Sequence, residues 1–361
     1  MRPQSLNPAR LAELFRKEFQ LCRVAEGETL VVLSDLGARR EYTAAAFAAA
    51  RELGADAYEM CVSESPTWTT VGVPTVGSCK GAVEALKAAD MLVCLHIPLF
   101  TQWMRDVRAS GTRALIVRDH PDELEQCMSP PGLKEAVVHA ADRYKKARKL
   151  RVVSDAGTDF TAELGQYPIN KQYGIADEPG HLDNWCSGLL HTFPNEGSAQ
   201  GTVVFSPGDI VILPYNRYIT GEVRLEIRDG FVRSIEGGMD AVLMRQWLDE
   251  HKTSEDDMDG HAVSHLGWGL HPNARWDNML LYGDEAERGA THSRAFAGNF
   301  LFSTGPNSEG GGKRTTRGHY NVPMRGCSIY LDGDMVVDHG KVVDPKMIVP
   351  RQPVAARGKR T

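Results

Sequence analysis

The apolar positions of the first 150 residues alternate between two spacings. Residues 6–25 carry them at helical spacing, and residues 29–35 contain a short apolar run that predicts a buried strand. Further helices are expected at 41–53, 83–89, 103–110 and 134–149, and further strands at 55–62, 91–95 and 113–117. Strands that alternate with helices favour an α/β fold with a parallel sheet. We therefore predict an α/β N-terminal domain over residues 1–150.

After residue 150 the pattern changes to short β signals. Strands are expected at residues 202–205, 209–213 and 223–227, the last leading into an Asp-Gly turn typical of a hairpin. Glycine and proline also become frequent, which indicates many turns. The prediction for residues 151–361 is a second, β-rich domain of the α+β class.

Composition narrows the class of protein. The chain has 361 residues, of which 42% are hydrophobic and 24% charged, and its formal charge is −6, which argues against a nucleic-acid-binding surface. The basic run 357–360 is expected to be a solvated tail. The first residues lead into a charged helical pattern, unlike a signal peptide, and no apolar stretch is long enough for a membrane span. Seven scattered cysteines without a C-x-x-C pair argue against disulfides and thiolate zinc sites. We expect a reduced, cytoplasmic protein.

The first domain offers little chemistry. It contains neither G-x-G-x-x-G nor G-x-x-x-x-G-K-[ST], so no dinucleotide or P-loop site is supported. His96 and His120 lie at the ends of predicted strands, where α/β proteins often bind ligands. A lone histidine at such a place is more often structural, and that is our interpretation of both.

The second domain carries a candidate metal site. His265 and His319 lie in short blocks rich in glycine and aromatic residues, and in a strand His319 and Asn321 would point to the same face. Two histidines and an aspartate in this arrangement hold Fe(II) in non-haem oxygenases, but here the third residue is the neutral amide Asn321. Turn chemistry alone would also supply glycine and asparagine. Turn chemistry would not require histidines among apolar residues. A metal site and plain turns therefore both remain as interpretations of these blocks.

Longer blocks carry a family resemblance. The chain resembles the 2,5-dihydroxypyridine 5,6-dioxygenase family, ring-opening enzymes of bacterial nicotinic acid breakdown, most closely in the second domain. The blocks are residues 156–160, 164–168, 176–180, 194–196, 264–270, 299–307, 311–314 and 327–332. The resemblance implies an aminopeptidase T-like fold, with a metal in the β-rich domain, and a homo-oligomer. It also implies Fe²⁺, or another divalent metal, held by His265, His319 and Asn321.

The departures from the family pattern concern the chemistry. Asn321 replaces a carboxylate, and Phe100 and Asn184 stand where the dioxygenase has pocket histidines suited to proton transfer. His191 is a candidate replacement imidazole. Glu309 and Ser303 complete the set of candidate catalytic residues, which is His191, Glu309 and Ser303. The carboxylates that a two-metal aminopeptidase needs are missing, which argues against that activity.

Three functions therefore compete. The first is an Fe(II)-dependent dioxygenase that cleaves a hydroxylated N-heteroaromatic ring with O2. The second is a single-metal hydrolase that opens a cyclic amide or an amino-substituted ring with a metal-activated water, with His191 or Glu309 as base. The third is a non-enzymatic relative that binds a small ligand. Several aromatic residues suit either an aromatic-lined pocket or a plain core. They are Trp185, Trp268, Phe300 and Phe302.

Overall fold

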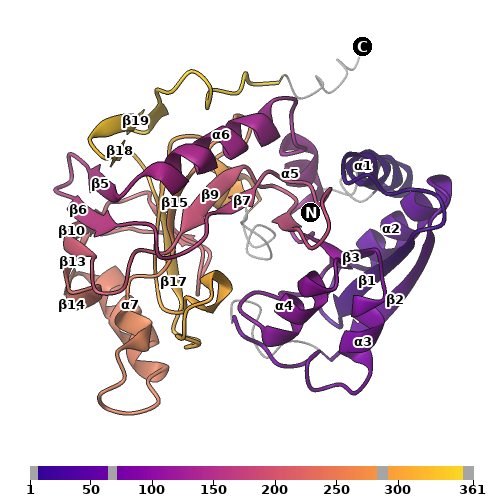
Figure 1. Ribbon diagram of the computed structural model, residues 1–361, viewed down its shortest axis with the longest axis horizontal. Helices are drawn as coiled ribbons and strands as arrows, with labels where there is room; N and C mark the ends of the chain where they lie inside the picture. Colours follow the sequence, from indigo (N-terminus) through magenta and orange to yellow (C-terminus); the bar gives the residue numbers. More distant parts are fainter. Residues whose placement is uncertain (1–6, 64–70, 283–291, 353–361) are drawn as a thin grey trace.

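The computed structural model describes residues 7–63, 71–282 and 292–352 and shows two packed parts, one on a parallel sheet and one on antiparallel sheets (Figure 1). The predicted tail at 357–360 and residue 6 of the first predicted helix lie outside the described residues. The two-part architecture confirms the predicted fold class. The exact division at residue 150 stays a prediction.

A five-stranded parallel sheet organises the first part, in the order β2-β1-β3-β4-β8. Its strands are β1 (Thr29–Asp35), β2 (Asp56–Val62), β3 (Met91–Cys94), β4 (Arg113–Ile116) and β8 (Leu182–Asn184). The first four were predicted to within one or two residues. β8 was not, because three residues are too few to show a period. It lies after residue 150, so the chain returns to the first sheet late.

Helices cover both faces of this sheet. They are α1 (Pro8–Leu21), α2 (Arg40–Glu52), α3 (Ala82–Lys87) and α4 (Gln102–Ala109). The chain then continues through α5 (Pro121–Gln126) to α6 (Leu133–Lys146), which lies over the second part of the molecule, against residues 170–172 and 189–192 (Figure 1). Successive residues of β1 point to opposite faces: Leu30 and Val32 pack in the core that includes α1 and α2, and Val31 and Leu33 in the core that includes α3 and α4. Figure 1 shows these helix pairs on either side of the sheet. A strand buried on both faces explains the apolar run in the sequence.

Both histidines at strand ends have structural contacts, as predicted. The Nδ1 atom of His96 lies 3.0 Å from Oδ2 of Asp35. His120 precedes the short helix α5, which the sequence did not predict, and its ring accepts the backbone N–H of Asp122 at 3.1 Å. The Glu123 carboxylate accepts the backbone N–H of His120 at 3.0 Å, which completes a capping box.

Two larger antiparallel sheets form the second part, with the orders β14-β13-β10-β6-β5-β18-β19-β20 and β17-β16-β15-β9-β7. The first contains β5 (Lys149–Val153), β6 (Asp159–Glu163), β10 (Gln200–Phe205), β13 (Val223–Arg228), β14 (Phe231–Gly237), β18 (Ser328–Leu331), β19 (Asp334–Asp338) and β20 (Lys341–Val342). The second contains β7 (Asn170–Gln172), β9 (Leu189–Thr192), β15 (Leu266–Gly269), β16 (Phe300–Thr304) and β17 (Tyr320–Met324). The predicted hairpin is β13–β14. A small ladder pairs β11 (Ile210–Val211) with β12 (Arg217–Tyr218).

The two large sheets pack through aromatic side chains. Phe160 of β6 meets Phe302 of β16 edge to face, with ring centroids 6.0 Å apart. The sequence allowed four aromatic residues to line a pocket or to belong to the core, and the structure shows all four fully buried in the core. They are Trp185, Trp268, Phe300 and Phe302. The remaining helices are α7 (Met239–Glu250), α8 (Asn278–Tyr282), α9 (His292–Ala295) and the 3₁₀ turns η2 (Asp259–His261) and η4 (Ser308–Gly310). Among the described residues, no helix has the length and apolar character needed to cross a membrane.

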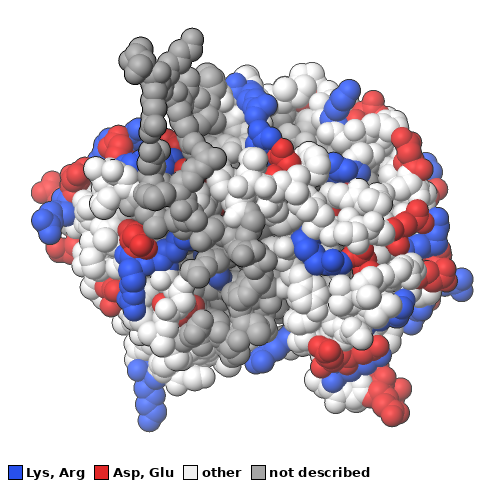
Figure 2. Space-filling model, turned by 180° about the vertical axis from the view of Figure 1, so that it is seen from behind, with Lys and Arg blue, Asp and Glu red and all other residues white. Residues whose placement is uncertain are grey.

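Charges are mixed on the visible surface. On the face drawn in Figure 2, basic and acidic side chains alternate over short distances. The chain carries 41 basic and 47 acidic residues, and on this face neither sign gathers into one continuous patch.

Candidate active site

A cavity of about 220 Å³ lies between the parallel-sheet part and the second antiparallel sheet. His191, His265, His319 and Asn321 line it from the antiparallel side. The opposite wall comes from the parallel-sheet part and includes Phe100. The structure therefore brings the three proposed metal ligands into one pocket with His191.

Neighbouring strands set the positions of these side chains. His191 lies in β9, His265 directly before β15, and Asn321 in β17 with His319 directly before it. Gly267 pairs with His191, and a Cβ on Gly267 would lie 1.9 Å from the carbonyl oxygen of Leu190. Only glycine permits this close approach of β15 to β9. The glycine-rich block around His265 thus lets two strands of the sheet approach closely beside the pocket.

The imidazoles of the pocket lie close together. The ring centroids of His265 and His319 are 5.1 Å apart, and those of His191 and His265 are 4.8 Å apart. The Nδ1 atom of His319 donates to the carbonyl oxygen of Thr304 at 2.7 Å. This contact fixes the ring and leaves Nε2 with its lone pair for a ligand.

Burial keeps the three imidazoles neutral. It lowers the pKa of His191 to about 3 and that of His319 to about 4, and it lowers the pKa of His265 well below its usual value. The positive charge of Arg294, which also lines the cavity, lowers all three pKa values further. Neutral imidazoles are the form that binds metal ions.

The donor atoms fit a divalent metal. Asn321 Nδ2 lies 2.9 Å from His265 Nε2, and its Oδ1 is buried without a hydrogen-bond partner among the described residues. Two ligands at right angles on one metal, each about 2.1 Å from it, are about 3 Å apart. Turning the amide by 180° would place Oδ1 at that spacing, and N and O of an amide are assigned by their surroundings. The amide brings no negative charge, unlike the expected carboxylate.

The other predicted residues have different surroundings. The carboxylate Oε1 of Glu309 accepts the backbone N–H of Phe100 at 2.7 Å, and burial raises the pKa of Glu309, although Arg108 opposes the rise. The hydroxyl of Ser303 donates to the carbonyl oxygen of His265 at 2.8 Å, and Ser303 is not among the described residues that line the cavity. Ser303 therefore holds the His265 backbone rather than facing a ligand.

The loop that carries Glu309 is attached to the β-rich part by Glu196. The Glu196 carboxylate accepts Nδ2 of Asn307 at 2.6 Å, the hydroxyl of Tyr167 at 2.6 Å and NH1 of Arg314 at 2.5 Å. Burial alone would raise the pKa of Glu196, but these three donors lower it below its usual value. The block 194–196 thus supports the pocket from outside.

Sequence reasoning missed some of the pocket. Phe100 lines the cavity with its ring centroid 5.1 Å from that of His319, but Asn184 is not among the described lining residues. His181, three positions before Asn184, does line the cavity, and its Nε2 lies 3.0 Å from Oδ2 of Asp183. Arg294 lies on the four-residue helix α9, which has no periodic signal. Only the tertiary fold brings His181 and Arg294 to the pocket.

Comparisons with known proteins agree with this geometry. A family model described as 2,5-dihydroxypyridine 5,6-dioxygenase matches residues 10–344. A 2,5-dihydroxypyridine 5,6-dioxygenase of Pseudomonas putida KT2440 is 39% identical over 346 residues, which cover 94% of this chain and 97% of that protein. A solved structure of 2,5-dihydroxypyridine dioxygenase from Pseudomonas putida KT2440 superposes with a TM-score of 0.89 at 38% identity, over 94% of this chain and 99% of that one.

A more distant structure shares the fold alone. AmpT from Thermus thermophilus has a TM-score of 0.63 at 11% identity, over 93% of this chain and 99% of its own. The family model spans residues 10–344, which include the pocket residues, and the Pseudomonas relative covers 94% of this chain. The chain therefore belongs to the 2,5-dihydroxypyridine 5,6-dioxygenase family and is an enzyme of the oxidoreductase class.

Proposed function

We propose that this enzyme is an Fe(II)-dependent dioxygenase that cleaves a small hydroxylated N-heteroaromatic ring, of the dihydroxypyridine type, with O2. The observation that carries the proposal is the pocket itself, where His265, His319 and Asn321 meet beside a cavity of about 220 Å³. This volume is below the range of pockets for drug-sized ligands, which suits a single ring. The names of the similar Pseudomonas proteins support the substrate class.

The metal would be held by His265, His319 and Asn321. Membership of a dioxygenase family supports a metal cofactor, and its identity as Fe(II) is part of the proposal. Bound Fe(II) would supply a Lewis-acidic, redox-active centre for a dihydroxylated ring and O2. Two neutral imidazoles and an amide leave the ion with its full positive charge, so the site favours a substrate that binds as an anion.

The remaining pocket residues would orient the substrate and move protons. Phe100 covers His319 and excludes water on that side. Glu309, with its raised pKa, is the group placed to hold a proton, and the neutral His191 can accept a hydrogen bond from a ring hydroxyl. Ser303 keeps a positioning role through the His265 carbonyl oxygen.

Oxygen uptake tests the function. Enzyme loaded anaerobically with Fe(II) is mixed with 2,5-dihydroxypyridine and air-saturated buffer, and we expect one O2 consumed for each ring opened. His265→Ala and His319→Ala should abolish uptake, whereas His339→Ala, an exposed histidine between β19 and β20, should leave it unchanged. Ring opening without O2 and with uptake of water would overturn the proposal and favour the single-metal hydrolase.

The proposal includes a cytoplasmic homo-oligomer. All seven cysteines are free, as a reducing compartment requires. Leu280 and Leu281 of α8 are 70% and 60% exposed, which supports a contact between subunits there. Light scattering of the purified protein measures the subunit number, and a monomer at micromolar concentration would contradict the self-association.

A further inference from the structure

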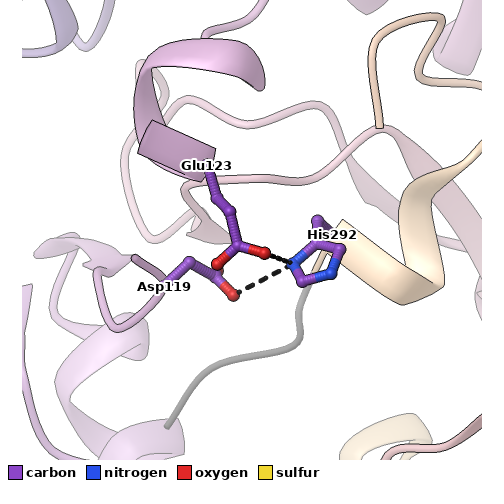
Figure 3. A group of neighbouring side chains, drawn as sticks. All are labelled: Asp119, Glu123 and His292. Carbon is purple, nitrogen blue, oxygen red and sulfur yellow. Dashed lines mark ion pairs between the residues drawn. The ribbon is translucent and has the colours of Figure 1, made fainter. Parts of the chain in front are cut away.

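A second group of ligand-type side chains lies outside the pocket. Asp119 follows β4, Glu123 is on α5 and His292 is the first residue of α9, and Figure 3 shows the three side chains directed toward one another. Their ligand atoms all lie within 4.8 Å of one another. None of the three lines the cavity described above. The group joins two segments that are far apart in the sequence.

The three side chains are buried. Glu123 and His292 are 0% exposed and Asp119 is 1% exposed. The Nδ1 atom of His292 lies 3.1 Å from Glu123 Oε1 and 3.4 Å from Asp119 Oδ1 (Figure 3). Two carboxylates thus face one imidazole nitrogen in a space without solvent. Such a group is costly to bury unless a cation or shared protons compensate the charges.

Glu123 and His292 each have one polar atom that points out of the cluster and one that points into it. The outer atom of each makes a hydrogen bond outside the cluster. Glu123 Oε2 accepts the backbone N–H of His120 at 3.0 Å, and His292 Nε2 lies 3.1 Å from the hydroxyl of Ser293. The inner atoms, Glu123 Oε1 and His292 Nδ1, meet only within the cluster, through the ion pairs given above, and make no hydrogen bond of standard geometry in the described parts of the chain. Metal ligands have this arrangement, because hydrogen bonds on the far side orient the donor atom.

A fourth polar group lies beside the cluster. Asn278 of α8 is fully buried next to Glu123, and neither side-chain oxygen nor nitrogen has a hydrogen-bond partner of standard geometry in the described chain. The amide N–H is placed to donate to the Glu123 carboxylate, which leaves the amide oxygen without a partner in the described chain. Its oxygen is available as a further ligand to an ion held by the three charged groups.

We propose that Asp119, Glu123 and His292 bind one divalent transition-metal ion, such as Zn²⁺ or Mn²⁺, at a second site distinct from the pocket. Two carboxylate oxygens and one imidazole nitrogen form a donor set that these borderline ions accept. The ion would neutralise the two carboxylates and connect α5 to α9. Arg294 lies two residues after His292 in α9 and lines the cavity, so the site would also steady one wall of the pocket.

The competing arrangement is a proton-sharing ion cluster without metal. Burial, together with the charge of Asp119, raises the pKa of Glu123 to about 7, whereas His292 opposes the rise. The two carboxylates raise the pKa of His292 although burial opposes this. Protons and a divalent ion therefore compete for the same atoms, and metal binding should release protons.

Metal binding to a variant without the pocket ligands separates the two arrangements. His265→Ala/His319→Ala removes the first site and leaves the second intact, and Zn²⁺ bound after gel filtration is measured by elemental analysis. We expect one equivalent in this double variant. Adding Asp119→Asn, which keeps the shape of the side chain, should reduce the double variant to zero. Adding Asp142→Asn, an exposed aspartate of α6, should leave one equivalent.

Two further measurements distinguish loss of the second metal site from unfolding of the variant. Zn²⁺ should raise the Tm of the double variant but not that of the variant with Asp119→Asn, and Co²⁺ should give visible absorption bands only in the former. A double variant that binds no more Zn²⁺ than the one with Asp119→Asn would overturn the proposal and leave the proton-sharing cluster. The outcome is independent of whether the pocket binds Fe(II) or turns over a dihydroxypyridine.

Discussion

Replacing Asn321 by aspartate should tighten Fe(II) binding in the pocket. The substitution exchanges an amide for a carboxylate of nearly the same shape, 2.9 Å from the Nε2 atom of His265. It also restores the two-histidine, one-carboxylate donor set that Fe(II) oxygenases use. If Asn321 is a ligand in the present enzyme, the added negative charge acts directly on the metal.

The size of the effect follows from two opposing terms. At a metal–ligand distance of about 2.1 Å and an effective dielectric constant of about 20, a carboxylate and one unit of positive charge attract by about 8 kcal/mol. Burying the carboxylate, since Asn321 is only 1% exposed, costs several kcal/mol of this gain. A net gain of about 1–3 kcal/mol lowers the Kd for Fe(II) by about 5- to 150-fold.

Anaerobic titration with Fe(II) against a competing chelator measures this Kd. Asn170→Asp is the matched control, because Asn170 lines the same cavity and no hydrogen bond joins it to His265 or His319 in the described chain. An unchanged Kd for Asn321→Asp would show that residue 321 is not a ligand. An equal gain in Asn170→Asp would assign the effect to the general field of the pocket. Without metal, Asn321→Asp should have a lower Tm, and Fe(II) should restore it.

Three further substitutions test the support of the pocket. Ser303→Ala removes the hydrogen bond to the His265 carbonyl oxygen and should lower the free energy of unfolding in urea by about 1–3 kcal/mol, whereas an unchanged midpoint would contradict the contact. Gly267→Ala should destabilise by about 1–3 kcal/mol or more and weaken metal binding, because its Cβ meets backbone at 1.9 Å; Gly238→Ala, which meets no atom within 4 Å, is the control. Glu196→Gln should destabilise the protein at pH 7, since the lowered pKa of Glu196 in the folded state stabilises the ionised form. The difference from wild type should shrink as the pH falls below about 4.3, the unfolded value for glutamate, and a difference that persists at pH 2 would refute the argument.

Local patterns were sufficient for most of the first part of the fold. β1 carries an apolar run because it is buried on both faces, and that property is written in consecutive residues. α5 and β8 were not predicted, because elements of six and three residues are too short to show a hydrophobic period. The hairpin β13–β14 was visible from its alternation and its Asp-Gly turn.

For the site, the chain itself specified the donor types, and the His-x-Asn triplet placed His319 and Asn321 on one side because side chains in a strand repeat every two residues. Whether His265 and His191 would meet them depended on strand order, since β9, β15, β16 and β17 become neighbours only through contacts between distant segments. The same holds for Arg294 at the pocket and for Asp119, Glu123 and His292 at the second cluster. No local spacing connects these residues, because packing between helices and sheets, not chain proximity, brings them together.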